Sequence, residues 1–287
     1  MTGLAGCYAV SRPGFTPVPL VLSSPHSGRS YTGEFLALSR LALPELRRSE
    51  DCFIEELFAG APPAGAILIA ADFPRAWCDV NREAWELDPA MFEDALPAWA
   101  NTTSPRVAAG LGTLARVVAS GEPIYRGKLA FAAARARVET CWQPYHDALA
   151  RLTRALLAAH GACLLLDCHS MPAHACRDRR PVPDIVLGDA HGAACHVRVL
   201  RAVDGFLSRR GYVVRRNDPY AGGFITRHYG TPARGIHALQ IEVARGLYMN
   251  ETNLQKTAGF ARVQADMTAL CAMLAENAAG LMGGDET

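Results

Sequence analysis

Residues 163–170 read Cys-Leu-Leu-Leu-Asp-Cys-His-Ser, a short apolar run that ends in an acid and a histidine. The run is continuous rather than alternating in apolar character, so residues 163–167 are predicted to form a strand covered on both faces. Five similar runs occur elsewhere in the chain, and most of them end in small or polar residues. They are residues 18–23, 66–71, 184–187, 212–215 and 237–243.

Amphipathic helical patterns lie between these runs. One pattern covers residues 138–156, and Pro144 inside it predicts a kink or a break. Two others cover residues 195–206 and 263–274. Strands that alternate with helices predict an α/β fold with a mixed or largely parallel sheet. Residues 87–122 carry few strand signals, so we expect an excursion over one end of the sheet there.

The composition is that of an ordinary globular protein. The 287 residues include 29 Lys and Arg and 28 Asp and Glu, a formal net charge of +1 that argues against a nucleic-acid or membrane-surface protein. Three prolines interrupt the first 22 residues, so no targeting signal is expected, and no run of 18 apolar residues predicts a membrane span. The nine cysteines form no CxxC pair, and we expect reduced thiols in the cytoplasm.

Candidate metal ligands follow the predicted strands, where ligands bind in open α/β sheets. His26 follows the first strand and His169 follows the strand at 163–167, and each is itself followed by serine. Two imidazoles so placed favour a metal site, which needs about three protein ligands when it is hydrolytic. Glu50 or Asp51 is the candidate third ligand. The competing interpretation is that both acids only stabilise the first turn of a helix at residues 50–58.

Glu242 is a candidate general base. Its neighbours Ile241 and Val243 are apolar, and a carboxylate in such a place is costly unless it is paired or functional. Partial burial raises the pKa of a carboxylic acid toward the range that suits a general base. The competing interpretation is an ion pair with Arg245 or with another arginine.

Three arginines are candidate anion-binding residues, because arginine pairs bidentately with carboxylates. They are Arg75, Arg82 and Arg227, with Asn81 and Thr226 directly beside the last two. The competing interpretation is a solvated surface arginine. Other catalytic templates are absent from the sequence: there is no GxSxG, P-loop or HExxH motif. Cys168 adjoins His169, but adjacent strand residues point to opposite faces, which argues against a cysteine nucleophile.

The order of these segments resembles that of the N-formylglutamate amidohydrolase family. The resemblance runs from about residue 20 to about residue 255, and the stretch Gly-Gly-Phe-Ile-Thr-Arg-His-Tyr-Gly at 222–230 is its most specific part. The other matching segments are residues 24–28, 50–51, 79–82, 142–149, 166–170, 183–188, 237–242 and 247–249.

The resemblance implies one domain over residues 1–287 with a three-layer α/β/α fold, akin to the zinc metallocarboxypeptidases. It implies a metal site with His26, Asp51 and His169 as ligands and Glu50 as the alternative to Asp51. Zn²⁺ is the expected ion, and Co²⁺, Ni²⁺ and Mn²⁺ also suit such ligands. The chain departs from the carboxypeptidase pattern, since no histidine is followed three residues later by glutamate.

The resemblance also implies the reaction, which is metal-dependent hydrolysis of N-formyl-L-glutamate to formate and glutamate in histidine degradation. Glu242 and Arg82 are then the catalytic residues, with Glu242 as the base and Arg82 binding a substrate carboxylate together with Asn81. Arg75 or Arg227 assists and helps to stabilise the oxyanion, and Thr226 is a further substrate-binding residue. The expected partner is a small N-acyl amino acid. The alternatives are a related deacylase or carboxypeptidase-like hydrolase, and a binding protein that has lost catalysis. The sequence carries no signal for an oligomeric state.

Overall fold

The structure, a computed structural model, describes residues 6–118 and 120–283. The chain forms two compact units. Among the described residues, the first comprises residues 6–9, 25–50, 70–118 and 120–148, and the second comprises residues 10–24, 51–69 and 149–283. The expectation of a single domain over residues 1–287 stays a prediction.

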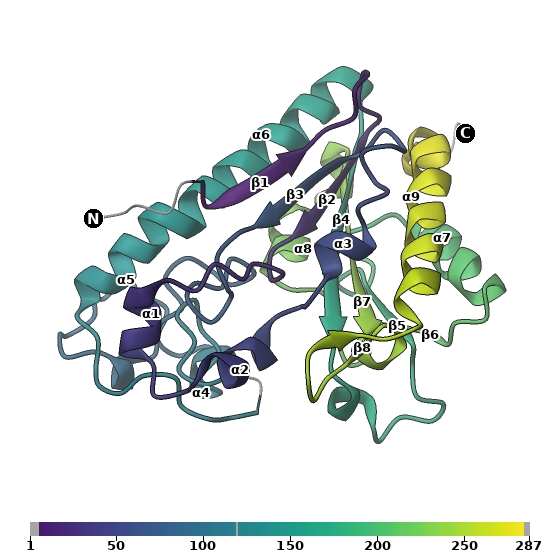
Figure 1. Cartoon of the computed structure of the whole chain (residues 1–287). Helices are drawn as coiled ribbons and strands as arrows, with labels where there is room; N and C mark the ends of the chain where they lie inside the picture. Colours follow the sequence, from purple (N-terminus) through teal and green to yellow (C-terminus); the bar gives the residue numbers. More distant parts are fainter. Residues whose placement is uncertain (1–5, 119, 284–287) are drawn as a thin grey trace. The chain divides into compact units, whose positions relative to one another are not determined.

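A seven-stranded sheet has the strand order β1-β3-β2-β4-β7-β5-β6 (Figure 1). Its strands are β1 (Tyr8–Ser11), β2 (Leu20–Ser24), β3 (Ile67–Ala71), β4 (Cys163–Met171), β5 (Ile185–Gly188), β6 (Val214–Arg216) and β7 (Ile236–Ala244). β4 pairs in parallel with β2 and β7, and β5 pairs in parallel with β6, whereas β5 and β7 are antiparallel. The prediction of a mixed, mostly parallel sheet is confirmed.

All six predicted strands are present, although one boundary was wrong. β4 continues to Met171 instead of ending at Asp167, so His169 and Ser170 lie inside the strand rather than beyond it. The polar residues were interpreted as the end of the strand, but their backbone stays in register with β7. The sequence patterns also missed β1 and the short hairpin formed by β8 (Met249–Asn250) and β9 (Gln255–Lys256).

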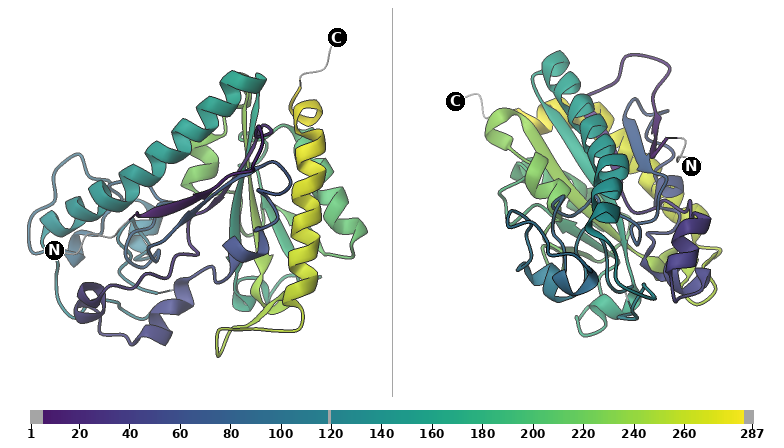
Figure 2. Two further views of the ribbon diagram at one scale, coloured as in Figure 1. Left: turned by 45° about the horizontal axis from the view of Figure 1, so that its top comes forward. Right: turned by 90° about the vertical axis from the view of Figure 1, so that its left-hand side faces the viewer.

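In the second unit, helices cover both faces of the sheet. Leu166 and Cys168 of β4 point into a core that includes residues of α3 (Ile54–Leu57), α7 (Val197–Arg209) and α9 (Phe260–Met282). The side chains between them point to the other face, where α8 (Phe224–Tyr229) packs against β4 and β7 (Figure 2). The expected three-layer α/β/α arrangement is therefore confirmed, with polar side chains on the α8 face of β4.

The helical stretch around Pro144 is interrupted as predicted. A π-helical turn, η3 (Val138–Trp142), separates α5 (Phe131–Arg137) from α6 (Gln143–His160). Proline has no N–H to give to the preceding turn, so the hydrogen-bond pattern changes there. The remaining helices are short: α1 (Gly33–Leu38), α2 (Leu43–Leu46), α4 (Pro105–Ala108), η1 (Arg47–Ser49), η2 (Pro89–Met91), η4 (Ala173–Cys176), η5 (Pro232–Arg234) and η6 (Arg245–Leu247).

The predicted excursion belongs to the first unit. Its described residues, 87–118 and 120–122, contain η2 and α4 and no strand of the sheet. A small separate cluster of apolar side chains holds it, including Leu87, Phe92 and Leu114.

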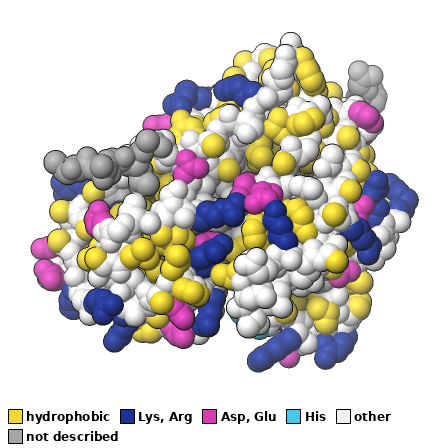
Figure 3. Space-filling view, viewed as in Figure 1, with side chains coloured by type: hydrophobic (Ala, Val, Ile, Leu, Met, Phe, Trp, Pro, Cys, Tyr) yellow, Lys and Arg dark blue, Asp and Glu magenta, His cyan; other side chains and the backbone are white. Residues whose placement is uncertain are grey.

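Three further features bear on the class of protein. Within the described residues, no helix has the length and apolar character that crossing a membrane requires. All nine cysteines lie in the described part of the chain, and all are buried free thiols. On the face shown in Figure 3, basic and acidic side chains are interspersed, in line with the near-neutral net charge.

Candidate active site

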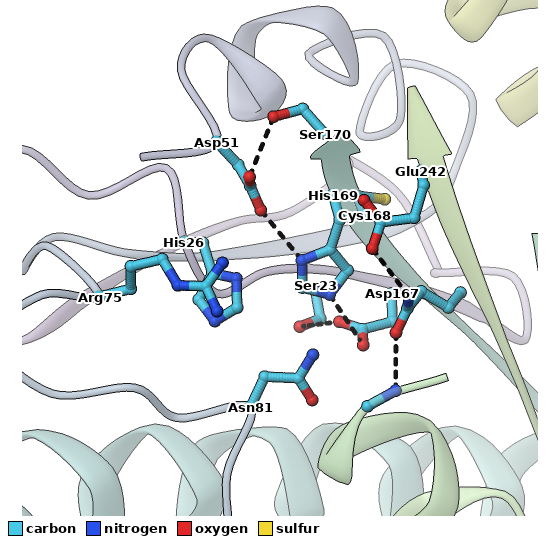
Figure 4. Close-up of polar contacts among 12 residues, drawn as sticks. Ser23, His26, Asp51, Arg75, Asn81, Asp167, Cys168, His169, Ser170 and Glu242 are labelled. Atoms are coloured by element: carbon cyan, nitrogen blue, oxygen red, sulfur yellow. Dashed lines mark hydrogen bonds and ion pairs between the residues drawn. The ribbon is translucent and has the colours of Figure 1, made fainter. Parts of the chain in front are cut away.

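Asp51 and His169 meet in the second unit (Figure 4). Asp51 Oδ2 lies 3.0 Å from His169 Nδ1, and both side chains are almost fully buried. The other carboxylate oxygen, Oδ1, accepts hydrogen bonds from Ser170 Oγ at 2.9 Å and from Arg245 Nη2 at 3.2 Å. The structure thus brings together two of the three predicted metal ligands, although 118 residues separate them in sequence.

The second ring nitrogen of His169 faces another buried acid. His169 Nε2 lies 3.0 Å from Asp167 Oδ2, because residues two apart on a strand share a face. Asp167 also accepts hydrogen bonds from Ser23 Oγ at 3.2 Å and from Thr226 Oγ1 at 3.5 Å. Such a carboxylate behind a histidine fixes the orientation and tautomer of the ring.

The charges around His169 favour its protonated form in the metal-free protein. Burial by itself lowers the pKa of His169, but the charge and hydrogen bond of Asp167, the hydrogen bond of Asp51 and the charge of Glu242 raise it well above its usual range. A metal ion bound to this ring would therefore have to displace a proton.

Glu242 lies beside His169 in the sheet. The two residues are directly paired in the register of β4 and β7, and Glu242 is 8% exposed. Gln240 Nε2 donates to Glu242 Oε1 at 2.9 Å, while Gln240 Oε1 accepts from the backbone N–H of Gly223 at 2.7 Å. The hydrogen bond with Gly223 fixes the orientation of the Gln240 side-chain amide, so the NH2 group of Gln240 faces Glu242. Arg245, the partner considered for Glu242, bonds to Ser170 and Asp51.

His26 and its partners form a similar arrangement in the first unit. His26 is 2% exposed, and its Nε2 lies 2.7 Å from Asp79 Oδ1. Asp79 also accepts from Arg75 Nη2 at 2.7 Å and from the backbone N–H of Asn81 at 2.9 Å. Burial by itself raises the pKa of Asp79, but Arg75, Arg82 and His26 bring it well below its usual range. Asp79 is therefore a carboxylate that accepts a hydrogen bond from His26.

The predicted anion-binding residues differ in exposure. Arg82 is largely buried and donates to the backbone oxygens of Leu111 and Asn81, each at 2.8 Å. Burial lowers the pKa of Arg82 to about 10. Thr226 is fully buried and bonds to Asp167, whereas Arg227 beside it is exposed. Arg75 keeps 24% of its side chain exposed.

Glu50 and Asp51 do not open a helix, so the interpretation of both as helix-dipole partners is wrong. Glu50 has extended backbone angles, and the one-turn helix α3 starts only at Ile54, after Phe53 with a left-handed φ of 66°. Glu50 accepts from Arg47 Nε at 3.0 and 3.2 Å through its two oxygens. Asp51, in contrast, faces His169.

Similarity to known proteins identifies the family of this chain. The family model for N-formylglutamate amidohydrolase matches residues 18–249, which is more than half of the chain. The chain belongs to the N-formylglutamate amidohydrolase family. An N-formylglutamate deformylase from Pseudomonas putida is 32% identical over 243 residues, which cover 82% of this chain and 83% of that protein.

Solved structures include a member of the same family. The crystal structure of N-formylglutamate amidohydrolase from Ralstonia eutropha JMP134 aligns with a TM-score of 0.89 and 35% identity, over 94% of this chain and 97% of that one. A gene product from Agrobacterium tumefaciens has a TM-score of 0.60 and 19% identity, over 96% and 93% of the two chains, and supports the fold alone.

The sequence did not reveal several residues that lie around the candidate active site of this chain. Asp167 and Asp79 lie in segments that match the family but were not expected to have a role, and Ser170, Gln240 and Arg245 were not expected to be site residues. A signal existed for Asp167, since strand residues two apart share a face. No local signal existed for Arg245, because its partner Asp51 is 194 residues away.

Close packing against the backbone of residues 72 and 73 explains why residue 28 is a glycine. A Cβ on Gly28 would lie 2.2 Å from the backbone oxygen of Phe73 and 2.6 Å from the backbone carbon of Asp72. We predict that Gly28→Ala lowers the free energy of unfolding by about 1–3 kcal/mol, because the backbone must move to accept the methyl group. Thermal or urea denaturation measures the change. The control is Gly33→Ala, where a Cβ would meet nothing within 4 Å, and equal effects of the two substitutions would contradict the prediction.

Proposed function

We propose that this chain hydrolyses the N-formyl amide of N-formyl-L-glutamate to formate and glutamate. The observation that carries the proposal is its membership of the N-formylglutamate amidohydrolase family over residues 18–249. The named activity of the Pseudomonas putida relative supports the same reaction. The buried acids and histidines on β4 and β7 supply groups that a hydrolase requires. The place of this reaction in histidine degradation stays a prediction.

In this proposal His26, Asp51 and His169 hold one divalent metal ion. Two imidazoles and one carboxylate are a donor set that zinc accepts in catalytic sites, and other divalent transition metals also suit it. Each histidine directs Nε2 to a buried aspartate, Asp79 or Asp167, so we assign Nδ1 as the metal-binding atom of both rings. Asp51 is preferred to Glu50 because it already faces His169 Nδ1.

Glu242 acts as the general base in this mechanism. It takes a proton from the water whose oxygen attacks the formyl carbon, and it delivers that proton to the nitrogen when the C–N bond breaks. Gln240 holds the carboxylate through the bond to Oε1. A bound metal ion supplies Lewis-acid polarisation of the formyl carbonyl and makes water more acidic.

The substrate is a dicarboxylate, and arginines are proposed to bind it. Arg227 is exposed and Arg75 is partly exposed, so both can form bidentate pairs with a carboxylate. Arg82, Asn81 and Thr226 complete the proposed substrate site. Since Arg82 and Thr226 already have internal hydrogen-bond partners, we expect them to act mainly by fixing the residues around them.

An activity screen tests the proposed function. The purified protein is incubated with N-formyl-L-glutamate, N-formyl-L-aspartate, N-formyl-L-leucine and N-acetyl-L-glutamate, and formate or acetate release is measured. We expect the fastest release from N-formyl-L-glutamate. Faster release from N-acetyl-L-glutamate would favour a related deacylase. No release from any substrate by metal-loaded protein would favour a binding protein.

The cysteines support a proposed cellular compartment. Nine buried free thiols suit a reducing compartment, which supports a cytoplasmic enzyme. Its proposed partner is a small N-acyl amino acid, without nucleic acid or membrane.

Metal binding is predicted to release a proton at neutral pH. The pKa of His169 is raised well above its usual range in the metal-free protein, so the ring is protonated at pH 7 and must lose a proton to bind a metal ion. The apparent affinity therefore rises with pH, about tenfold per pH unit for each proton released. Calorimetric titration of Zn²⁺ in buffers with different ionisation enthalpies measures the proton count. Binding without proton release between pH 6 and pH 7 would contradict the prediction.

A further inference from the structure

The Asp51 carboxylate is held by two donors on one oxygen. Ser170 Oγ and Arg245 Nη2 both donate to Oδ1, at 2.9 and 3.2 Å. Oδ2 faces His169 Nδ1 at 3.0 Å, and Figure 4 shows the carboxylate lying between Ser170 and His169. The two oxygens of one carboxylate therefore have different surroundings.

The turn that follows β7 supplies one of these donors. Arg245 begins η6 and is 6% exposed, and its Nε also donates to Ser170 Oγ at 3.0 Å. The guanidinium, the hydroxyl and the carboxylate thus form a closed ring of hydrogen bonds. At the end of the same turn, the Tyr248 hydroxyl donates to the backbone oxygen of Cys52 at 3.0 Å. The turn therefore holds both the side chain of Asp51 and the backbone beside it.

We propose that Arg245 is a positioning residue that presents Asp51 to the metal ion through Oδ2 alone. The inference rests on the metal site proposed above. A guanidinium bonded to both Ser170 and Oδ1 fixes the plane of the carboxylate, since its donors have a rigid planar geometry. A carboxylate that offers one oxygen leaves a coordination position open, as hydrolytic metal sites require.

The test compares the metal affinities of four variants with that of the full-length wild-type protein. Metal-free protein is titrated with Zn²⁺ against a chromophoric chelator. Arg245→Met is expected to weaken Zn²⁺ binding by about 10- to 100-fold, the usual cost of losing an outer-shell partner. Arg245→Lys is expected to lose less, because it keeps the charge but not the planar pair of donors. Ser170→Ala removes only the hydroxyl, and we expect weaker binding in this variant as well.

Arg210→Met is the matched control, because Arg210 also pairs with an aspartate of the second unit, Asp266, at 3.1 Å. We expect wild-type affinity in this variant. A second readout is the visible absorption of bound Co²⁺. It should weaken in Arg245→Met, since a released Oδ1 can add a ligand and a higher coordination number lowers the absorption of this ion.

The outcomes separate the inference from the metal site on which it rests. Unchanged Zn²⁺ affinity and an unchanged Co²⁺ spectrum in Arg245→Met and Ser170→Ala would overturn the positioning role. If the wild-type protein binds neither ion, the metal site itself is wrong and the inference fails with it. If Arg245→Met does not fold, as judged by circular dichroism, Ser170→Ala decides between these outcomes with the same two readouts.

Discussion

Replacing Glu242 by glutamine is expected to lower kcat for formate release by about 10²- to 10⁴-fold, which is the usual contribution of a general base. Glutamine keeps the size of the side chain and a hydrogen-bonding oxygen, but it cannot accept the proton from water. Gln240 remains able to donate to that oxygen, so the local fold should be kept. Steady-state kinetics with N-formyl-L-glutamate measure the loss.

Two controls distinguish catalysis from structural damage. Glu276→Gln changes an exposed glutamate on α9 and should leave kcat unchanged. The metal content of Glu242→Gln should equal that of the wild-type protein, because Glu242 is not a proposed ligand. Full activity in a metal-loaded Glu242→Gln variant would show that another group is the base.

The second large effect is expected at His169. Replacing His169 by glutamine removes one of the three proposed metal ligands. Loss of an outer-shell partner typically weakens metal binding by about 10- to 100-fold, and we expect a larger loss of affinity here. Formate release should fall with it at limiting metal. Competition titration with Zn²⁺ measures the affinity, and His160→Gln, which changes an exposed histidine on α6, is the control. Retained stoichiometric binding of Zn²⁺ at wild-type affinity would remove His169 from the site.

The same substitution should destabilise the metal-free protein. His169 lies between the carboxylates of Asp51 and Asp167, and removing one partner of a buried ion pair costs about 3–5 kcal/mol. Because the folded-state pKa of His169 is raised, this contribution is complete below about pH 6.5, the ordinary histidine value, and is lost as the pH rises through the raised pKa. The free energies of unfolding of the wild-type protein and His169→Gln, measured by urea denaturation, should therefore differ more at pH 6 than at a pH above the raised pKa of His169.

Most of the sheet was predictable because its strands correspond to short apolar runs in the sequence. β4 and β7 are continuous apolar runs, and such runs are typical of strands covered on both faces. β1 was missed because its four residues alternate between half-buried and exposed positions, the weak pattern of an edge strand. The helix expected at residues 50–58 shrinks to the single turn of α3, since the extended Glu50 and the left-handed Phe53 interrupt it.

The candidate site was predictable in its residue types but not in its pairings. Histidines and carboxylates at strand ends pointed to a metal site, and the order of the segments pointed to the family. The residues themselves left Glu50 and Asp51 open as the third ligand, and the resemblance favoured Asp51. The contact of Asp51 with His169 supports that proposal, whereas Glu50 bonds to Arg47. Arg245 was considered only as a partner of Glu242, and the structure shows that it bonds to Asp51.

The α/β class, the set of candidate donors and the resemblance to the family can be recognised in the sequence, because each depends on side-chain chemistry and spacing within a few residues. Which of these groups contact one another depends on the folded chain. The fold pairs His169 with Asp51 across 118 residues and Arg245 with Asp51 across 194 residues. The first contact joins the segment before α3 to β4, and the second joins that segment to the turn after β7, so no local pattern encodes either pairing.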